Sequence, residues 1–331
     1  MSNLNNILHG FGIPLSALVS VLFGMMILSF PLGTYTVFNS NIGDDIDHSF
    51  PLEQFDIFLA GLNLGIPIEF EIGDMFIVFW SIFVILFVIS FVGPKNNFLK
   101  SISNLLTKEK TNADSNYLVN IIKWFSIIVL ISGIINLIQE SFGIATLPPT
   151  YSNDLTLFLA ITISPITEEL GFRAMLIGIP LFLIFAHKSS IRFFFSALWH
   201  PHKNLHIMEH KRVITIIVLV GLFFGLAHII SGEPWSDGKF AQATISGIII
   251  GWVYYRYGLI SAILVHWATN YFIYSYIFFI SDLNQIQIQD ALSHSMIATL
   301  EVILVVTGIV SLAVVILNYF NQKTSKNVVS S

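Results

Sequence analysis

The chain has 331 residues, of which 55% are hydrophobic and 11% are charged, and its mean hydropathy is +0.78. An average soluble domain is about one quarter charged, so this composition excludes a water-soluble protein and predicts an all-α, polytopic membrane helical bundle. The net charge of -5 and the lack of dense basic clusters argue against a nucleic-acid partner. Because Cys is absent, the chain has no disulfide or thiolate chemistry.

Eight hydrophobic runs are long enough to cross a bilayer, whose hydrocarbon core takes about 20 residues of helix. In chain order they are 13–38, 75–93, 119–138, 155–186, 213–231, 240–257, 259–280 and 296–319. The fourth run exceeds one straight span and contains Pro165 and Pro180, so we expect it to be bent or tilted. We expect three parts: N-terminal helices with an outer loop at 1–150, a core of four helices at 151–280, and a last helix with a tail at 281–331.

Lys and Arg gather in alternate connections between these runs, namely 94–118, 187–212, the turn at Arg256 and the tail. The opposite connections contain only Lys239 among basic residues and are otherwise acidic. Short loops rich in Lys and Arg stay in the cytoplasm, so we expect both termini to be cytoplasmic, which agrees with an even number of spans. On the outer face we expect an amphipathic or re-entrant element at 50–72.

Three charges interrupt the fourth run, at Glu168, Glu169 and Arg173. Ionisable groups inside a span are costly and normally face the interior of the bundle. Glu169 and Arg173 are four residues apart, so they lie on one face of the helix and can pair. Glu168 lies about 100° around the helix and has no counter-ion there, so it could take a proton from water and return it to a leaving group. A purely structural ion cluster explains the three charges equally well.

Two later runs carry further polar groups. His266 and Asn270 share a helix face and could donate two hydrogen bonds to one oxygen, as an oxyanion site requires. A hydrogen-bonded clamp between helices explains that pair equally well. His228 follows Phe224 by one turn, and a lone histidine in an apolar helix is more often a packing residue. Taken together, a carboxylate, a histidine and a His/Asn pair on three helices supply what water-mediated peptide hydrolysis needs.

At these residues the sequence resembles the CPBP (or ABI) family of intramembrane proteases, which includes the type II CAAX prenyl endopeptidases. Three family motifs occur in order over about 155–275: EELGFR at 168–173 matches Glu-Glu-x-x-x-Arg, FGLAH at 224–228 matches Phe-x-x-x-His, and HWATN at 266–270 matches His-x-x-x-Asn. The resemblance implies an eight-helix core whose active site lies inside the membrane and opens to the cytosol.

The resemblance also implies roles for the site residues. Glu168 and His228 would activate the water, and His266 and Asn270 would stabilise the oxyanion. Three further residues would support them, namely Glu169, Arg173 and Phe224. Hydrolysis in this family depends on the glutamate and uses no metal, so we expect no cofactor. A catalytic zinc ion held by two His and one Glu is the alternative.

We therefore expect an intramembrane endopeptidase whose partners are the lipid bilayer and a membrane-anchored peptide or protein substrate. A C-terminally prenylated substrate and a bacteriocin precursor fit equally well. Two other classes stay open. One is an ion- or proton-coupled transporter, since intramembrane Glu and His also relay protons, although no internal repeat is apparent. The other is a catalytically silent scaffold or immunity protein with the same motifs.

The connection 187–212 carries a rival pattern. HIMEH at 206–210 fits the His-x-x-Glu-His arrangement of a zinc peptidase, which requires a buried helix. Adventitious metal binding and a solvated loop are the competing interpretations. In the same connection, IRFFFSALW at 191–199 predicts an interfacial helix on the inner leaflet.

Overall fold

The computed structural model describes residues 2–59, 62–107, 116–146, 153–230 and 236–329, and helices dominate these ranges. The longer helices are α1 (Ser2–Asn39), α2 (Ile72–Val92), α4 (Tyr117–Ser141), α5 (Asp154–Glu168), α9 (His210–Ile230), α10 (Lys239–Tyr257), α11 (Leu259–Trp267), α12 (Ile273–Asn284) and α14 (Ser295–Val329). The shorter ones are α3 (Phe98–Leu106), α6 (Ile179–Phe185), α7 (Ile191–Trp199), α8 (Pro201–Asn204) and α13 (Ile288–Leu292). Two π-helical segments, η1 (Glu169–Gly178) and η2 (Ala268–Phe272), continue α5 and α11.

Within the described residues, six helices are long and apolar enough to cross a membrane. They are Gly10–Asn39, Ile72–Val92, Tyr117–Ser141, His210–Ile230, Leu259–Asn284 and Ser295–Asn321. The protein is therefore an all-α polytopic membrane protein, as the composition predicts. The runs expected at 155–186 and 240–257 are helical too, but neither is among the six. The count of eight spans stays a prediction.

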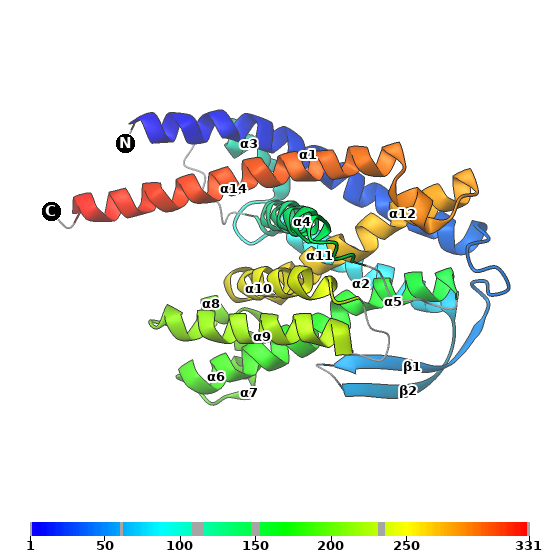
Figure 1. Ribbon diagram of the computed structural model, residues 1–331. Helices are drawn as coiled ribbons and strands as arrows, with labels where there is room; N and C mark the ends of the chain where they lie inside the picture. Colours follow the sequence, from blue (N-terminus) through cyan, green and yellow to red (C-terminus); the bar gives the residue numbers. More distant parts are fainter. Residues whose placement is uncertain (1, 60–61, 108–115, 147–152, 231–235, 330–331) are drawn as a thin grey trace.

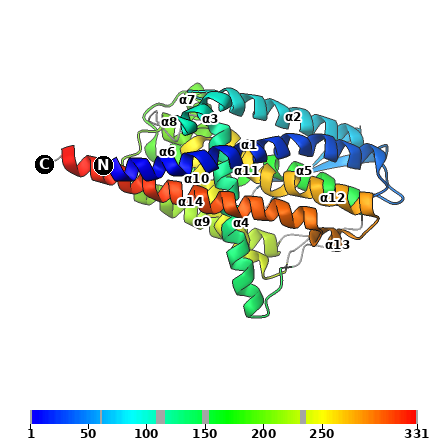
Figure 2. The ribbon, with the colours of Figure 1, turned by 90° about the horizontal axis from the view of Figure 1, so that it is seen from above.

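The first and last helices, α1 and α14, pack against each other and run in opposite directions, so both ends of the chain lie at one end of the bundle (Figures 1 and 2). We call this the basic end, because its connections carry Lys95, Lys100, Lys188, Arg192, Lys203, Lys211, Arg212 and Arg256. The expected interfacial helix at 191–199 is α7, which lies at this end (Figure 1). The opposite, acidic end carries Asp44, Asp45, Asp47, Asp154, Asp282 and Asp290.

The bend expected in the fourth run takes the form of a widened helix. α5 begins after Asn153, whose side-chain oxygen accepts hydrogen bonds from two N–H groups of the first turn. The helix widens into η1 at Glu169 and returns to α geometry at Ile179, beside Pro180. π-helical turns are rare and occur frequently at functional sites. Here η1 and η2 contain residues of the first and third sequence motifs.

The element expected at 50–72 is an antiparallel β-hairpin, with β1 (Pro51–Leu59) paired to β2 (Leu62–Glu71). Its second strand alternates apolar and other residues, which is the period of a strand rather than of an amphipathic helix. The hairpin packs its first strand against α5 and η1, so it lies beside the helix that carries the paired glutamates (Figure 1).

The helices α9 and α10 approach each other closely because glycines line their contact. A Cβ at Gly221 would clash with Ile248, and one at Gly225 would clash with Thr244. A Cβ at Gly247 would come within 3.0 Å of the Phe224 ring. Small residues allow membrane helices to pack backbone to backbone, and here they hold Phe224 against α10.

Candidate active site

The buried Glu169 carboxylate connects the first and third motifs. Its Oε1 lies 2.8 Å from Nδ1 of His266, 97 residues later in the chain. Its Oε2 lies 3.1 Å from Nε of Arg173, and both of these side chains are fully buried. The pairing of Glu169 with Arg173 that the spacing predicts is therefore confirmed. The contact with His266 fixes that imidazole, because Nδ1 faces the carboxylate and Nε2 is directed elsewhere.

The neighbouring Glu168 has a different environment. Its side chain is 18% exposed, whereas that of Glu169 is fully buried. The Oε2 atom lies 3.9 Å from Nε2 of His266 and has no hydrogen-bond partner among the described residues. A buried carboxylate oxygen normally has such a partner. Glu168 is thus the carboxylate of the pair that can take up a water molecule or a substrate group.

His228 reaches the same place from the end of α9. Its Nδ1 lies 2.9 Å from the Phe224 carbonyl oxygen, which can only accept, so Nδ1 donates and Nε2 is left as an acceptor. Its ring packs edge-on against the Phe224 ring, with the ring centres 4.6 Å apart, and the centre of the His266 ring lies 6.0 Å from that of the same Phe224 ring. His228 is within electrostatic range of both Glu168 and His266.

Asn270 completes the group from η2. Its Nδ2 lies 3.3 Å from Nε2 of His266 and donates to Oγ of Ser164 at 2.9 Å. The amide oxygen accepts from the Thr269 hydroxyl at 3.3 Å. The structure therefore brings together all four residues that sequence reasoning selected as catalytic. Their chemical roles stay predictions.

Phe224 has a structural role that spacing alone does not reveal. The guanidinium carbon of Arg173 lies 4.4 Å from the centre of the Phe224 ring, in cation–π range. The ring also meets Phe172 edge-on at 4.9 Å. Phe224 thus contacts the buried arginine and also packs beside His228 and His266.

Sequence reasoning missed two residues of this site. Ser164 precedes Glu168 by one turn and binds Asn270, a contact between distant helices that no local pattern indicates. Lys239, the first residue of α10, is half-buried and within electrostatic range of Glu168. It shares a helix face with Ala243, which packs with Phe224. A signal for Lys239 exists in the sequence, because it is the one basic residue of the otherwise acidic connections.

The side chains as placed do not form a zinc site. Within the described part of the chain, no three His, Asp or Glu side chains group as metal ligands. His266 uses Nδ1 for Glu169, and its Nε2 lies 3.3 Å from the Asn270 amide nitrogen, which is not a zinc ligand. Metal independence of the reaction stays a prediction.

The rival pattern at 206–210 lacks the helix that a zinc peptidase requires. Residues 206–209 precede α9, and Glu209 forms a surface pair with Arg212 at 2.7 Å. His206 lies beside His187, with ring centres 4.5 Å apart, whereas His210 faces the Tyr255 hydroxyl. The two histidines therefore have different neighbours and do not share a ligand site.

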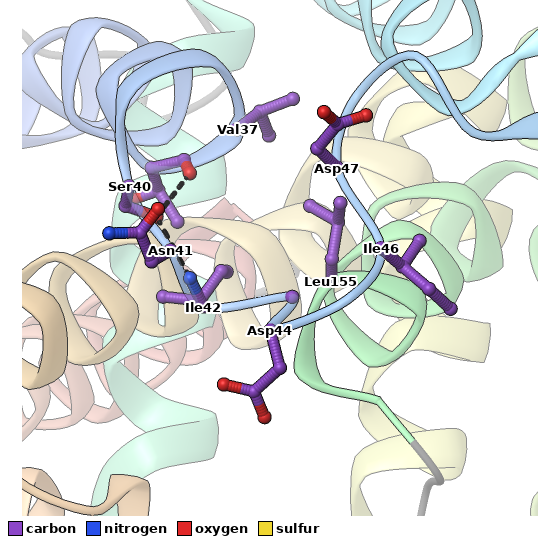
Figure 3. Close-up of a pocket in the computed structure, with 10 residues that line it drawn as sticks. Val37, Ser40, Asn41, Ile42, Asp44, Ile46, Asp47 and Leu155 are labelled. Carbon is purple, nitrogen blue, oxygen red and sulfur yellow. Dashed lines mark hydrogen bonds between the residues drawn. The ribbon is translucent and has the colours of Figure 1, made fainter.

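A pocket at the acidic end is separate from these residues. It is lined by the end of α1, the loop that follows it and Leu155 (Figure 3). Leu155 precedes Glu168 by 13 residues on α5, which corresponds to about 20 Å along a helix. In Figure 3 the side chains of Asp44 and Asp47 point in different directions, so the pocket does not gather them into one acidic site.

Residues 152–272 match a family described as type II CAAX prenyl endopeptidase Rce1-like. The matched segment contains every side chain of the site, from Ser164 on α5 to Asn270 on η2. No curated protein matches the chain, and no solved structure does.

Proposed function

Since residues 152–272 form a domain of the type II CAAX prenyl endopeptidase Rce1-like family, whose members are CAAX-type intramembrane proteases, we propose that this protein hydrolyses a peptide bond of a membrane-associated substrate with water activated by Glu168 and His228. The observation that carries the proposal is the unpartnered Oε2 of Glu168, 3.9 Å from the fixed imidazole of His266.

The reaction begins with a water molecule held between Glu168 and His228. Glu168 removes a proton from the water as its oxygen attacks the carbonyl carbon of the scissile bond. The carbonyl oxygen becomes an oxyanion. Glu168 then returns the proton to the leaving amine, the C–N bond breaks and a new carboxyl group remains on the N-terminal product.

The oxyanion is stabilised by His266 and Asn270. The amide N–H of Asn270 and Nε2 of His266 converge, since the two nitrogens are 3.3 Å apart, and donors pre-arranged in this way stabilise charge as it develops. Because Nδ1 of His266 faces Glu169, Nε2 donates only when both ring nitrogens carry protons. The carboxylate of Glu169, which contacts Nδ1, compensates that positive charge.

The substitution Glu168→Gln tests the proposal. It removes the proton acceptor and changes the side-chain volume little, so we expect cleavage of membrane-anchored peptides to be lost while thermal unfolding is unchanged. The matched control is Glu209→Gln, at an exposed glutamate of the surface pair, and it should retain full activity. The assay uses the purified full chain and paired prenylated and unprenylated peptides, with and without a chelator.

The outcomes separate the function classes. Cleavage by Glu168→Gln at the wild-type rate contradicts the mechanism. Loss of activity with a chelator, restored by zinc, supports the metal alternative. Proton or ion flux into vesicles that depends on Glu168, without cleavage, supports a transporter, and neither activity supports a silent scaffold.

A further inference from the structure

Two helix faces meet at the site, and each presents two polar side chains four residues apart. On α5, Ser164 and Glu168 share one face. The other face, formed where α11 continues into η2, carries His266 and Asn270, and α5 packs against both of these segments. Two contacts join the faces: Ser164 Oγ lies 2.9 Å from Asn270 Nδ2, and Glu168 Oε2 lies 3.9 Å from His266 Nε2. The face of α5 that carries the reactive carboxylate therefore also holds the Asn270 amide.

The hydroxyl of Ser164 is directed by the proline that follows it. In a regular α-helix the N–H of residue 165 would donate to the Ile161 carbonyl oxygen, but Pro165 has no N–H. The Ser164 hydroxyl donates to that carbonyl oxygen instead, at 3.4 Å. Because its one hydrogen is used there, Oγ presents only lone pairs to Asn270 and accepts from the amide nitrogen.

The orientation of the Asn270 amide matters for the reaction. The oxygen and nitrogen ends of a primary amide have nearly the same shape, so hydrogen-bond partners decide which end faces which neighbour. An N–H group directed at the reacting carbonyl stabilises the oxyanion, whereas an amide oxygen there would repel it. Turning the amide over would set its oxygen against the lone pairs of Ser164 Oγ, at a separation where a hydrogen bond is now made. The Thr269 hydroxyl, 3.3 Å from the amide oxygen, favours the same orientation.

We propose that Ser164 is a positioning residue for the reaction, which fixes the Asn270 amide with an N–H directed toward the oxyanion. One N–H of this amide donates to Ser164, and the other faces Nε2 of His266 and is the one available to the carbonyl oxygen of the substrate. The inference rests on the proposed function, because an oxyanion forms only if a peptide bond is attacked. No bond is made or broken at Ser164 itself.

A double-mutant cycle between Ser164 and Asn270 tests this role. Asn270→Ala removes the donor and should lower kcat by about 100- to 1,000-fold. Ser164→Ala leaves the donor in place without its orienting acceptor, and we expect kcat to fall by about 10- to 100-fold. KM should change by less than about two-fold, because the oxyanion is absent from the bound substrate. In the Asn270→Ala background, which has no amide to orient, Ser164→Ala should change kcat by less than about two-fold.

Ser29→Ala on α1 is the matched control. Ser29 is buried, and its hydroxyl donates to the carbonyl oxygen three residues earlier, that of Met26, as Ser164 does to Ile161. We expect wild-type kcat for this variant and a melting temperature in detergent close to that of Ser164→Ala. If Ser164→Ala fails gel filtration as a folded protein, Ser164→Cys replaces it, because a thiol has nearly the volume of a hydroxyl but is a weak acceptor. The same loss of kcat is expected.

The outcomes separate this inference from the proposed function. Wild-type kcat in Ser164→Ala overturns the positioning role and leaves the proteolytic function standing. An equal loss of kcat from Ser164→Ala with and without the Asn270 amide also overturns it, since Ser164 would then act through another group. A wild-type protein that cleaves none of the membrane-anchored peptides contradicts the proposed function and this inference together.

Discussion

At the scale of single residues, the two adjacent glutamates have separate tasks. Glu169 is fully buried and holds Arg173 and His266, whereas Glu168 is partly exposed and has an oxygen without a partner among the described residues. Neighbouring residues of an α-helix are rotated by about 100° about the helix axis. This rotation is enough to direct one side chain into the packed core and the other toward the reacting atoms. Glu169 is accordingly a positioning residue.

A double substitution shows whether Glu169 positions His266 for the reaction or only stabilises the fold. Glu169→Leu alone leaves the Arg173 charge buried without its partner, which costs about 3–5 kcal/mol. The pair Glu169→Leu/Arg173→Met should recover most of that stability, since apolar replacement of a buried ion pair is often neutral. We expect kcat of the double variant to remain about 10- to 100-fold low, because His266 lacks its orienting acceptor.

Thermal unfolding in detergent and steady-state kinetics check this expectation. If Glu169 only stabilised the fold, activity would return together with stability in the double variant. A double variant with wild-type kcat would therefore contradict the positioning role.

His200, between α7 and α8, gives a prediction about pH. Burial, with nearby Lys203 in the next place, lowers the pKa of His200 from 6.5 to about 4. In that interval the unfolded chain binds a proton that the folded protein does not, so stability rises with pH. The contribution is fully present above about pH 6.5 and is lost as the pH falls toward about 4.

The check is the melting temperature in detergent at pH 7 and pH 5. We expect a smaller drop between the two for His200→Asn than for the wild type, whereas His206→Asn, at an exposed histidine of the same connection, should behave like the wild type. Equal drops in all three proteins would show that His200 does not titrate in this way.

At the scale of elements, the glycine-lined contact of α9 and α10 positions the second motif. Phe224 and His228 lie on α9 where α10 comes closest, and α10 brings Ala243 against the Phe224 ring. Side-chain volume at this contact therefore affects the site, although no glycine touches a reacting atom. The two helices act as one support for Phe224.

Gly225→Ala tests this support. The new methyl group would clash with Thr244, and overpacking of this kind costs about 1–3 kcal/mol. We expect lower melting temperature and lower cleavage together, because the displaced helix moves His228. The matched control is Gly133→Ala on α4, where nothing lies within 4 Å of the added carbon, so stability should hold or improve. Equal effects of the two substitutions would contradict the role of the glycine-lined contact of α9 and α10.

At the scale of the whole molecule, the bundle separates its charges between two ends. The basic end has both termini, and the acidic end has the loop after α1 (Figures 1 and 2). Antiparallel α1 and α14 require an even number of crossings. Six candidate helices and eight expected spans both satisfy that requirement.

Fusion of a fluorescent protein to either terminus tests this topology. Because both termini lie at the basic end, and that end is expected in the cytoplasm, both fusions should fluoresce in cells, as should a double fusion. A fluorescent protein that matures at only one terminus would mean an odd number of crossings. The uncleaved size of each fusion on a gel is the control.

How much of this could be read from the sequence depends on the range of each contact. The Glu169–Arg173 pair lies within one helix, so spacing predicts it. The contacts of Glu169 with His266 and of Asn270 with Ser164 join helices that are distant in the sequence. They depend on how each helix is rotated about its axis, and that rotation is set by packing. The hairpin at 51–71 was missed as a strand pair because its period was judged helical or re-entrant. The π-helical segments η1 and η2 could not be predicted, because a helix that widens by one residue per turn has no characteristic amino-acid composition.

The π-helical turns of η1 allow the two halves of one helix to face different surroundings. In η1 the main chain takes up extra residues per turn, which offsets the angular phase of 179–185 from that of 154–168. The upstream half can thus direct Glu168 to the reacting centre, while the downstream half keeps Leu181 in the core. Removing one residue from the middle of η1 would shorten the helix by only about 1.5 Å, yet it would swing the two halves out of alignment.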